Sequence, residues 1–262
     1  MMKKLMHAVA ICSTVVASLS AMTARAEEAK PEHEVSFNAS LVSDYRYRGI
    51  SQSRLDPALQ GGADYTHNPS GFYAGTWLST IKWVKDIGNG AGNTPVEWDL
   101  YAGKKGELVK DVSYDVGGLA YVYVNNKLDD VPGFKNANTF EIYGQLGYGP
   151  AYIKYSHALT TLFGIPDSKN SGYVDIGANV DLGSDYTLNL HGGYQKVRGV
   201  NDSAATYSDY KVGVSKVLPQ LGGVTLALAA VGTNADKTFY ASPANGKFLG
   251  KHAVVVSAAK TF

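Results

Sequence analysis

The stretch that decides the fold reads Val35-Ser36-Phe37-Asn38-Ala39-Ser40-Leu41-Val42. Its odd positions are all apolar, and its even positions are polar as far as Ser40. Successive side chains of a strand point to opposite faces, so the stretch predicts a strand with one apolar and one polar face. We expect the strand to continue to Arg48, with tyrosines at the end of its outward face and charged residues on its inward face; the tyrosines are Tyr45 and Tyr47, and the charged residues are Asp44, Arg46 and Arg48.

The same alternation recurs along the rest of the chain. It is clearest in five segments, which are residues 96–103, 140–146, 174–181, 188–191 and 209–214. Weaker segments lie near 57–66, 71–81, 112–124, 151–158, 224–232 and 252–262. Together with the first, these segments predict about twelve strands.

The connections between these segments alternate in length. Short ones, rich in turn-forming residues, are residues 67–71, 104–111, 149–150, 183–185 and 218–223. Longer ones are residues 49–56, 82–95, 125–138, 159–170, 197–207 and 233–251. Short periplasmic turns that alternate with longer external loops are typical of a transmembrane barrel. The sequence therefore predicts an all-β chain, an antiparallel up-and-down transmembrane β-barrel of about twelve strands with both termini periplasmic.

The two ends of the chain carry signals of export and assembly. Residues 1–26 have a positive start, an apolar stretch and small residues before the expected cut after Ala26, which is the pattern of a cleavable signal peptide. Residues 27–262 would then form a single barrel domain. The last strand ends in Phe262, a terminal aromatic of the kind that the barrel-assembly machinery reads. We therefore expect an outer-membrane location in a Gram-negative bacterium, with membrane lipid and lipopolysaccharide as surroundings.

Composition excludes several classes of function. The only cysteine, Cys12, lies in the expected signal peptide, so the mature chain has no disulfide and no thiolate site. The formal net charge is +1 and no basic stripe is present, which argues against binding to nucleic acid. We expect no cofactor and no metal, because no histidine pair or carboxylate cluster has metal-ligand spacing along the sequence.

The chain resembles the TorF family of porins. The resemblance is carried by residues 43–53, Ser-Asp-Tyr-Arg-Tyr-Arg-Gly-Ile-Ser-Gln-Ser, and is supported by residues 71–77, 97–103, 207–213 and 260–262. It covers the chain after the signal peptide. It implies an outer-membrane channel but no particular substrate.

Strand parity assigns a set of charged side chains to the barrel interior. These are Asp44, Arg46, Arg48, Asp64, Glu97, Asp99, Asp115, Glu141, Lys154, Asp175, His191, Asp209 and Lys211. Charged groups inside a barrel require water or mutual pairing, so two interpretations stay open. One is a narrow water-filled pore with a mild preference for cations, since acids outnumber bases. The other is a salt-bridged interior with no path through it.

The inward charges at the end of the first strand also allow two interpretations. Arg46 and Arg48 could form part of a constriction that holds an anionic group. Alternatively, they pair with acids on the flanking strands and anchor the loop at residues 49–56.

The function predicted from the sequence is passive diffusion of small hydrophilic solutes or ions through an outer-membrane channel. A non-conducting structural or adhesive barrel is the alternative, and an outer-membrane hydrolase is a weaker one. Ser156 and His157 are adjacent on one strand and point to opposite faces, so they cannot meet as nucleophile and base. His191, two residues from Asn189, fits one polar interior residue among many. We therefore expect no enzyme.

Overall fold

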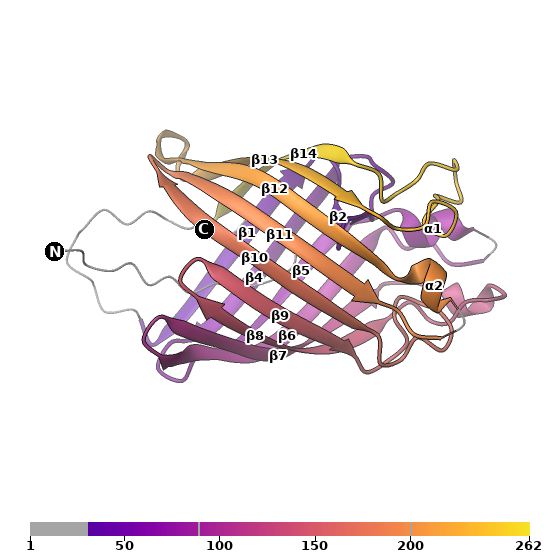
Figure 1. Cartoon of the computed structure of the whole chain (residues 1–262), viewed down its shortest axis with the longest axis horizontal. Coiled ribbons are helices and arrows are strands. Elements are labelled where there is room, and N and C mark those ends of the chain that lie inside the picture. Colours follow the sequence, from indigo (N-terminus) through magenta and orange to yellow (C-terminus); the bar gives the residue numbers. More distant parts are fainter. Residues whose placement is uncertain (1–30, 89, 200) are drawn as a thin grey trace.

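The computed structural model describes residues 31–88, 90–199 and 201–262, so the expected signal peptide, residues 1–26, lies outside the described residues. Twelve strands form the wall of the molecule: β1 (His33–Val42), β4 (Ala58–His67), β5 (Phe72–Thr80), β6 (Val96–Val109), β7 (Val112–Tyr123), β8 (Thr139–Tyr148), β9 (Ala151–Ala158), β10 (Gly172–Gly183), β11 (Tyr186–Lys196), β12 (Tyr207–Leu218), β13 (Val224–Thr233) and β14 (Ala253–Thr261). Each strand pairs antiparallel with its neighbours along the chain, and β1 closes the barrel against β14 (Figure 1). The predicted up-and-down barrel is confirmed.

Alternation along the strands produces the predicted apolar outer face. In β1, Val35, Phe37 and Leu41 are more than half exposed, whereas Ser36 and Asn38 between them face inward and are half-buried. A closed ladder leaves no strand edge unpaired, which is the condition for placing strands in hydrocarbon. Among the described residues, no helix is both long enough and apolar enough to span a membrane.

Closure depends on the last residues of the chain. Residues 38–42 of β1 pair with residues 257–261 of β14. The ladder is extended by Phe262, whose backbone N–H donates to the carbonyl of Phe37 at 2.8 Å. The Phe262 side chain remains exposed on the outside. Its role as an assembly signal stays a prediction.

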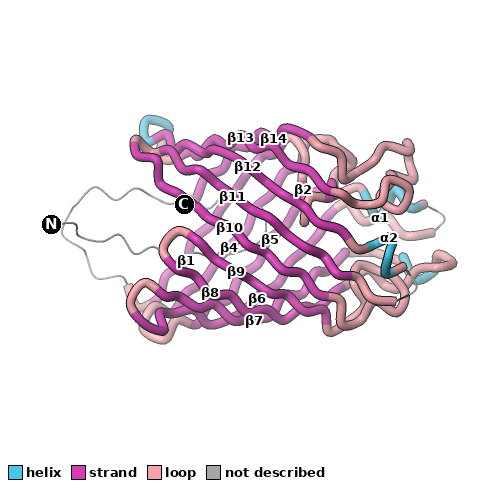
Figure 2. Tube along the Cα trace, in the orientation of Figure 1, coloured by secondary structure: helices cyan, strands magenta, loops and turns pink. Residues whose placement is uncertain are grey.

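The connections follow the predicted alternation of short and long. Five turns lie at one end of the barrel, and the longer loops lie at the other, together with the helices α1 (Trp83–Ile87) and α2 (Asp202–Ala205) (Figure 2). These two ends are called the turn end and the loop end. Short 3-10 helices lie at Leu128–Asp130 in a loop and Pro219–Leu221 in a turn. The start of β1 and the end of β14 both lie at the turn end (Figure 1).

Two predicted boundaries are wrong. The predicted turn at residues 104–111 is mostly strand: β6 continues to Val109, and only residues 110–111 turn. Its lysines are accommodated because their long side chains pack over rings, with Lys104 Nζ 5.1 Å from the centre of the Phe72 ring and Lys105 Nζ 5.3 Å from that of Tyr73.

The second wrong boundary is the end of the first strand. β1 stops at Val42, and the chain then folds into the barrel as two short paired strands, β2 (Arg46–Tyr47) and β3 (Ile50–Ser51). Tyr45 and Tyr47, predicted to face outward, are buried inside. They lie there because their hydroxyls find buried polar partners, which no lipid-facing position offers.

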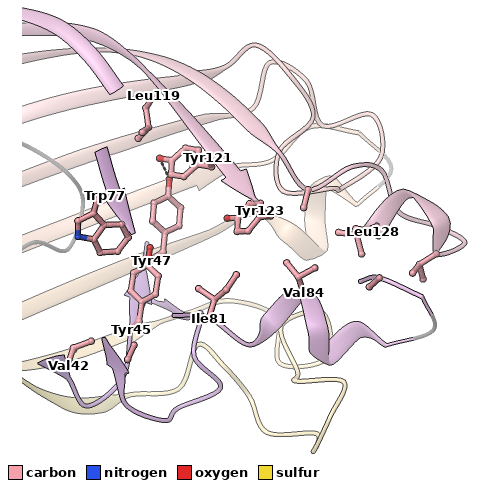
Figure 3. Packing of buried hydrophobic residues seen from close by; sticks show 14 of the residues in the cluster. Val42, Tyr45, Tyr47, Trp77, Ile81, Val84, Leu119, Tyr121, Tyr123 and Leu128 are labelled. Atoms are coloured by element: carbon pink, nitrogen blue, oxygen red, sulfur yellow. Dashed lines mark hydrogen bonds between the residues drawn. The ribbon is translucent and has the colours of Figure 1, made fainter. Parts of the chain in front are cut away.

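The loop end has an apolar core of its own. Tyr45, Tyr47, Trp77 and Tyr121 belong to a buried cluster that extends up to Val84 on α1 (Figure 3). Two smaller buried clusters lie beside it. One joins the loop at residues 159–171 to the loop at residues 197–206, and the other joins Ile50 to the loop at residues 234–252. The loops are therefore packed over the end of the barrel.

Candidate functional site

The interior of the barrel is crossed by residues 43–57, here called the inner hairpin. Its tip is Arg48-Gly49, and both residues have positive φ, 46° and 77°. A Cβ atom on Gly49 would lie 2.4 Å from Thr233 Cγ2 and 2.7 Å from Asp209 Cβ. Those residues belong to β12 and β13, whereas the hairpin starts and ends on β1 and β4. The tip therefore packs closely against other strands of the wall, and only glycine fits there.

Arg48 anchors the tip to the barrel wall. Its Nη1 and Nη2 donate to the two carboxylate oxygens of Glu141 at 3.1 and 2.6 Å, and Nη1 also donates to Gln195 Oε1 at 2.6 Å. Its guanidinium carbon lies 4.3 Å from the centre of the Tyr173 ring and 4.8 Å from that of Tyr47. This is a bidentate, buried ion pair with cation–π contacts to two tyrosine rings.

Arg46 connects the two arms of the hairpin and joins them to a neighbouring loop. Its Nε donates to Asp44 at 2.5 Å, and its Nη1 donates to the carbonyls of Gly49, Leu249 and Lys251 at 2.9 to 3.1 Å. Asp44 also accepts a hydrogen bond from Ser51 Oγ at 2.5 Å. The arginines thus pair with acids and anchor a loop, as one of the two interpretations predicted. The acids, however, are not on flanking strands: one is in the hairpin itself, and the other is on β8.

Tyrosine hydroxyls link the hairpin to two further strands. Tyr45 Oη and Tyr123 Oη both donate to Glu97, at 2.5 and 2.7 Å. Tyr47 points toward Tyr121, and their hydroxyls are 2.6 Å apart (Figure 3). These contacts keep the buried carboxylate of Glu97 satisfied, as buried polar networks require.

A second group of charges surrounds His191 on β11. Its Nδ1 lies 2.8 Å from Asp175 Oδ1, and its Nε2 lies 2.6 Å from Asp209 Oδ1. Tyr173 Oη donates to the other oxygen of Asp209 at 2.9 Å. The imidazole therefore bridges two aspartates on the neighbouring strands β10 and β12.

One interior carboxylate retains an unsatisfied oxygen. Asp99 is 3 % exposed, and its Oδ1 is buried with no hydrogen-bond partner within the part of the chain that the structure describes. It follows Glu97 on the inward face of β6.

Toward the turn end, several inward side chains are only half-buried. Inward side chains such as Arg48 and Glu141 near the loop end are buried, whereas the half-buried ones toward the turn end include Ser36, Asn38, Asp64 and Asn189. Charges in this half still have partners: Asp64 accepts from Tyr101 Oη at 2.6 Å, and Asp115 accepts from Tyr73 Oη at 2.5 Å. The barrel is therefore packed at the loop end and more accessible at the turn end.

The structure places the whole set of predicted interior residues inside the barrel. Asp44, Arg46, Arg48, Glu97, Asp99, Asp115, Glu141, Lys154, Asp175 and Asp209 are buried, and Asp64, His191 and Lys211 are half-buried. Lys154 Nζ lies 3.9 Å from the centre of the Tyr143 ring. That these residues line a conducting pore stays a prediction.

The sequence prediction missed the inward tyrosines and Gln195. Tyr121 and Tyr123 share strand parity with Asp115, and Tyr173 shares it with Asp175, so parity could have found them. Tyr45 and Tyr47 lie beyond the end of the first wall strand, where alternation no longer indicates which side chains face lipid.

His157 lies on the outer face of the barrel, as do His33 and His67. Ser156 and His157 point to opposite faces as predicted, and His157 contacts Tyr155 and Asn170 instead. Spacing along the sequence reveals no metal-ligating histidine pair, and the absence of a metal stays a prediction; one pair is close only in space. His33 and His67 are opposite each other in the β1–β4 ladder, and together with Glu32 they offer ligand atoms within 4.8 Å of one another.

At the base of the hairpin an ion pair holds the loop. Lys82 Nζ donates to Asp56 at 2.6 Å, and this hydrogen bond lowers the pKa of Asp56 below its usual range. The pair is solvent-exposed, so its contribution to stability is small.

Comparison with known proteins places this geometry among bacterial barrels. A family model described as "Bacterial protein of unknown function (Gcw_chp)" matches residues 26–262. A search of curated protein sequences gave no match. Among solved structures, the NanC porin is similar with a TM-score of 0.51 at 11% identity, covering 87% of this chain and 98% of that one. The KdgM porin is similar with a TM-score of 0.50 at 6% identity, covering 87% and 97%. At such identities the likeness concerns the fold.

Proposed function

This chain belongs to the Gcw_chp family of bacterial proteins, and we propose that it is an outer-membrane channel for passive diffusion of small hydrophilic solutes or ions. One observation carries the proposal: the closed barrel is apolar on its outside and polar and charged on its inside. A water-soluble protein has the opposite arrangement. Charged side chains are tolerated inside a barrel that holds water.

The location follows from the same arrangement. The strands would span the outer membrane of a Gram-negative bacterium, in contact with lipid and lipopolysaccharide. The turns and both termini would face the periplasm, and the packed loops would face outward. Export by residues 1–26 and recognition of Phe262 by the barrel-assembly machinery complete the proposal. The resemblance of residues 43–53 to the TorF family of porins supports it, as does the fold shared with two proteins named as porins.

Selectivity would arise around the inner hairpin. Arg48 is neutralised by Glu141, and Arg46 by Asp44. Within the part of the chain that the structure describes, Glu97 and Asp99 form no salt bridge, so two acidic side chains would remain without a basic partner at this level of the interior. Acidic side chains in a pore favour cations. The channel would therefore be narrow and mildly cation-selective, and its chemistry would need no catalytic group.

A non-conducting structural barrel is the second candidate. It is favoured by the burial of the inner hairpin, which packs against the wall at the loop end. A twelve-stranded barrel lies between eight-stranded barrels, whose interiors are filled, and sixteen-stranded channels. The size of the barrel therefore favours neither candidate function.

The experiment that separates the two candidates is a planar-bilayer recording of the refolded protein across a salt gradient. We expect discrete current steps, with a reversal potential of the sign that cation preference gives. Insertion of a heat-resistant barrel that passes no current would contradict the channel and favour the structural candidate.

A further inference from the structure

A cluster of metal-ligating side chains lies outside the lumen, at the turn end of the barrel. His33 begins β1, and His67 ends β4; they are partners in the ladder between these strands. Glu32 precedes β1. Each of the three offers one ligand atom, and these atoms lie within 4.8 Å of one another.

The distances within the cluster match a metal coordination shell. Glu32 Oε1 lies 3.4 Å from His67 Nε2 and 3.7 Å from His33 Nε2. In a tetrahedral zinc site with bonds of about 2.0–2.1 Å, neighbouring ligand atoms are about 3.3 Å apart. Small rotations of exposed side chains would bring the three atoms to that spacing.

The other nitrogen of each ring is already held by a hydroxyl. His33 Nδ1 lies 2.8 Å from Tyr65 Oη, and His67 Nδ1 lies 2.6 Å from Ser70 Oγ. In the tautomer that donates from Nδ1 to these hydroxyls, both Nε2 lone pairs are directed at the cluster. Partners of this kind orient the ring and raise its basicity at metal sites.

We propose that Glu32, His33 and His67 bind one divalent transition-metal ion, for which Zn²⁺ is the best match. Two imidazole nitrogens and one carboxylate suit zinc, whereas Ca²⁺ and Mg²⁺ prefer shells of oxygen alone. The side chains of Glu32 and His33 are more than half exposed, so an aqueous ion can reach them. The site is independent of the proposed channel, and a bound ion would join the start of β1 to the end of β4.

The test is isothermal titration of the refolded protein in detergent, free of any added histidine tag, with ZnCl₂ at neutral pH. We expect one equivalent of Zn²⁺ to bind. Binding should weaken at least tenfold in H33Q and in H67Q, and about tenfold in Y65F, which leaves all three ligands in place. The matched control is H157Q, another histidine on the outer face with a tyrosine hydroxyl at its Nδ1, which should bind zinc as the wild type does.

Two results would overturn the proposal. One is a wild-type protein that binds no Zn²⁺. The other is an unchanged affinity in H33Q and H67Q while their heat-dependent gel mobility shows a folded barrel. If either histidine variant does not fold, Y65F and E32Q decide: zinc affinity unchanged in both contradicts the site, and a loss in both supports it.

Discussion

Arg48 is the side chain that joins the tip of the inner hairpin to the barrel wall. It is buried, and among the described residues its ion-pair partner is Glu141, which it contacts through two hydrogen bonds. Removing one partner of a buried ion pair leaves the other charge uncompensated. We expect R48M to lower the free energy of unfolding by about 3–5 kcal/mol, measured by denaturant unfolding of the refolded protein.

The exposed pair Lys82–Asp56 provides the control for that variant. D56N should cost less than about 1 kcal/mol, because a solvated pair contributes little. Since pairing lowers the folded-state pKa of Asp56, its small contribution should be present near neutral pH and disappear as the pH falls through that lowered value. An R48M variant as stable as D56N would contradict the anchoring role of Arg48.

Charge at the hairpin should also set ion preference. The double variant R46A/R48A removes two positive charges and leaves Asp44 and Glu141 in place. If these residues face the conducting path, the reversal potential in a salt gradient should move further toward that of an ideal cation channel. A reversal potential equal to that of the wild type would contradict the assignment of both arginines to the conducting path.

At the scale of an element, the inner hairpin depends on Gly49. G49A adds a methyl group where Thr233 and Asp209 are too close, and it also strains a positive φ. The tip should therefore be displaced from β12 and β13, and the open-channel conductance should rise.

The control for Gly49 separates the clash from the backbone strain. Gly133 also has a positive φ, 89°, but nothing lies within 4 Å of its added Cβ. G133A should destabilise the backbone by about 1 kcal/mol without causing a clash. Its conductance should equal that of the wild type, and an equal rise in both variants would contradict the packing of the tip.

The hairpin is also the element that the sequence could not predict. Alternation identified every wall strand, because lipid on one face and water on the other force a period of two. Residues 43–48 keep the period of two after the chain has left the wall. Parity therefore predicts a longer strand with Tyr45 and Tyr47 facing outward. Contacts with residues far away in sequence, among them Glu97 and Tyr121, fix their place inside.

At the scale of the whole molecule, the inside and outside of the barrel should respond oppositely to charge. Leu228 on β13 is half exposed on the outer face, and its neighbour Ala229 faces inward. In lipid, L228R should cost about 2–4 kcal/mol of folding free energy, as expected for arginine near the midplane. A229R should be tolerated, because its guanidinium would point into the polar interior. Equal loss of stability in both would contradict the assignment of the two faces.

The cluster of Glu32, His33 and His67 could not be predicted from the sequence. His33 and His67 are far apart along the chain, and their spacing gives no ligand motif. The β1–β4 register places them opposite each other, and register is a property of the closed sheet. Strand number and loop order were thus predictable, whereas contacts across the barrel and between strand ends were not.

The measurement that tests the central claim most directly is the single-channel conductance of a variant without the inner hairpin. Val42 and Ala58 are partners in the β1–β4 ladder, so a short Asn-Gly turn can replace residues 44–56 without opening the wall. If the hairpin narrows a water-filled channel, the variant should conduct several times more current than the wild type and lose part of its ion preference. A folded variant that conducts no more than the wild type would contradict the channel account.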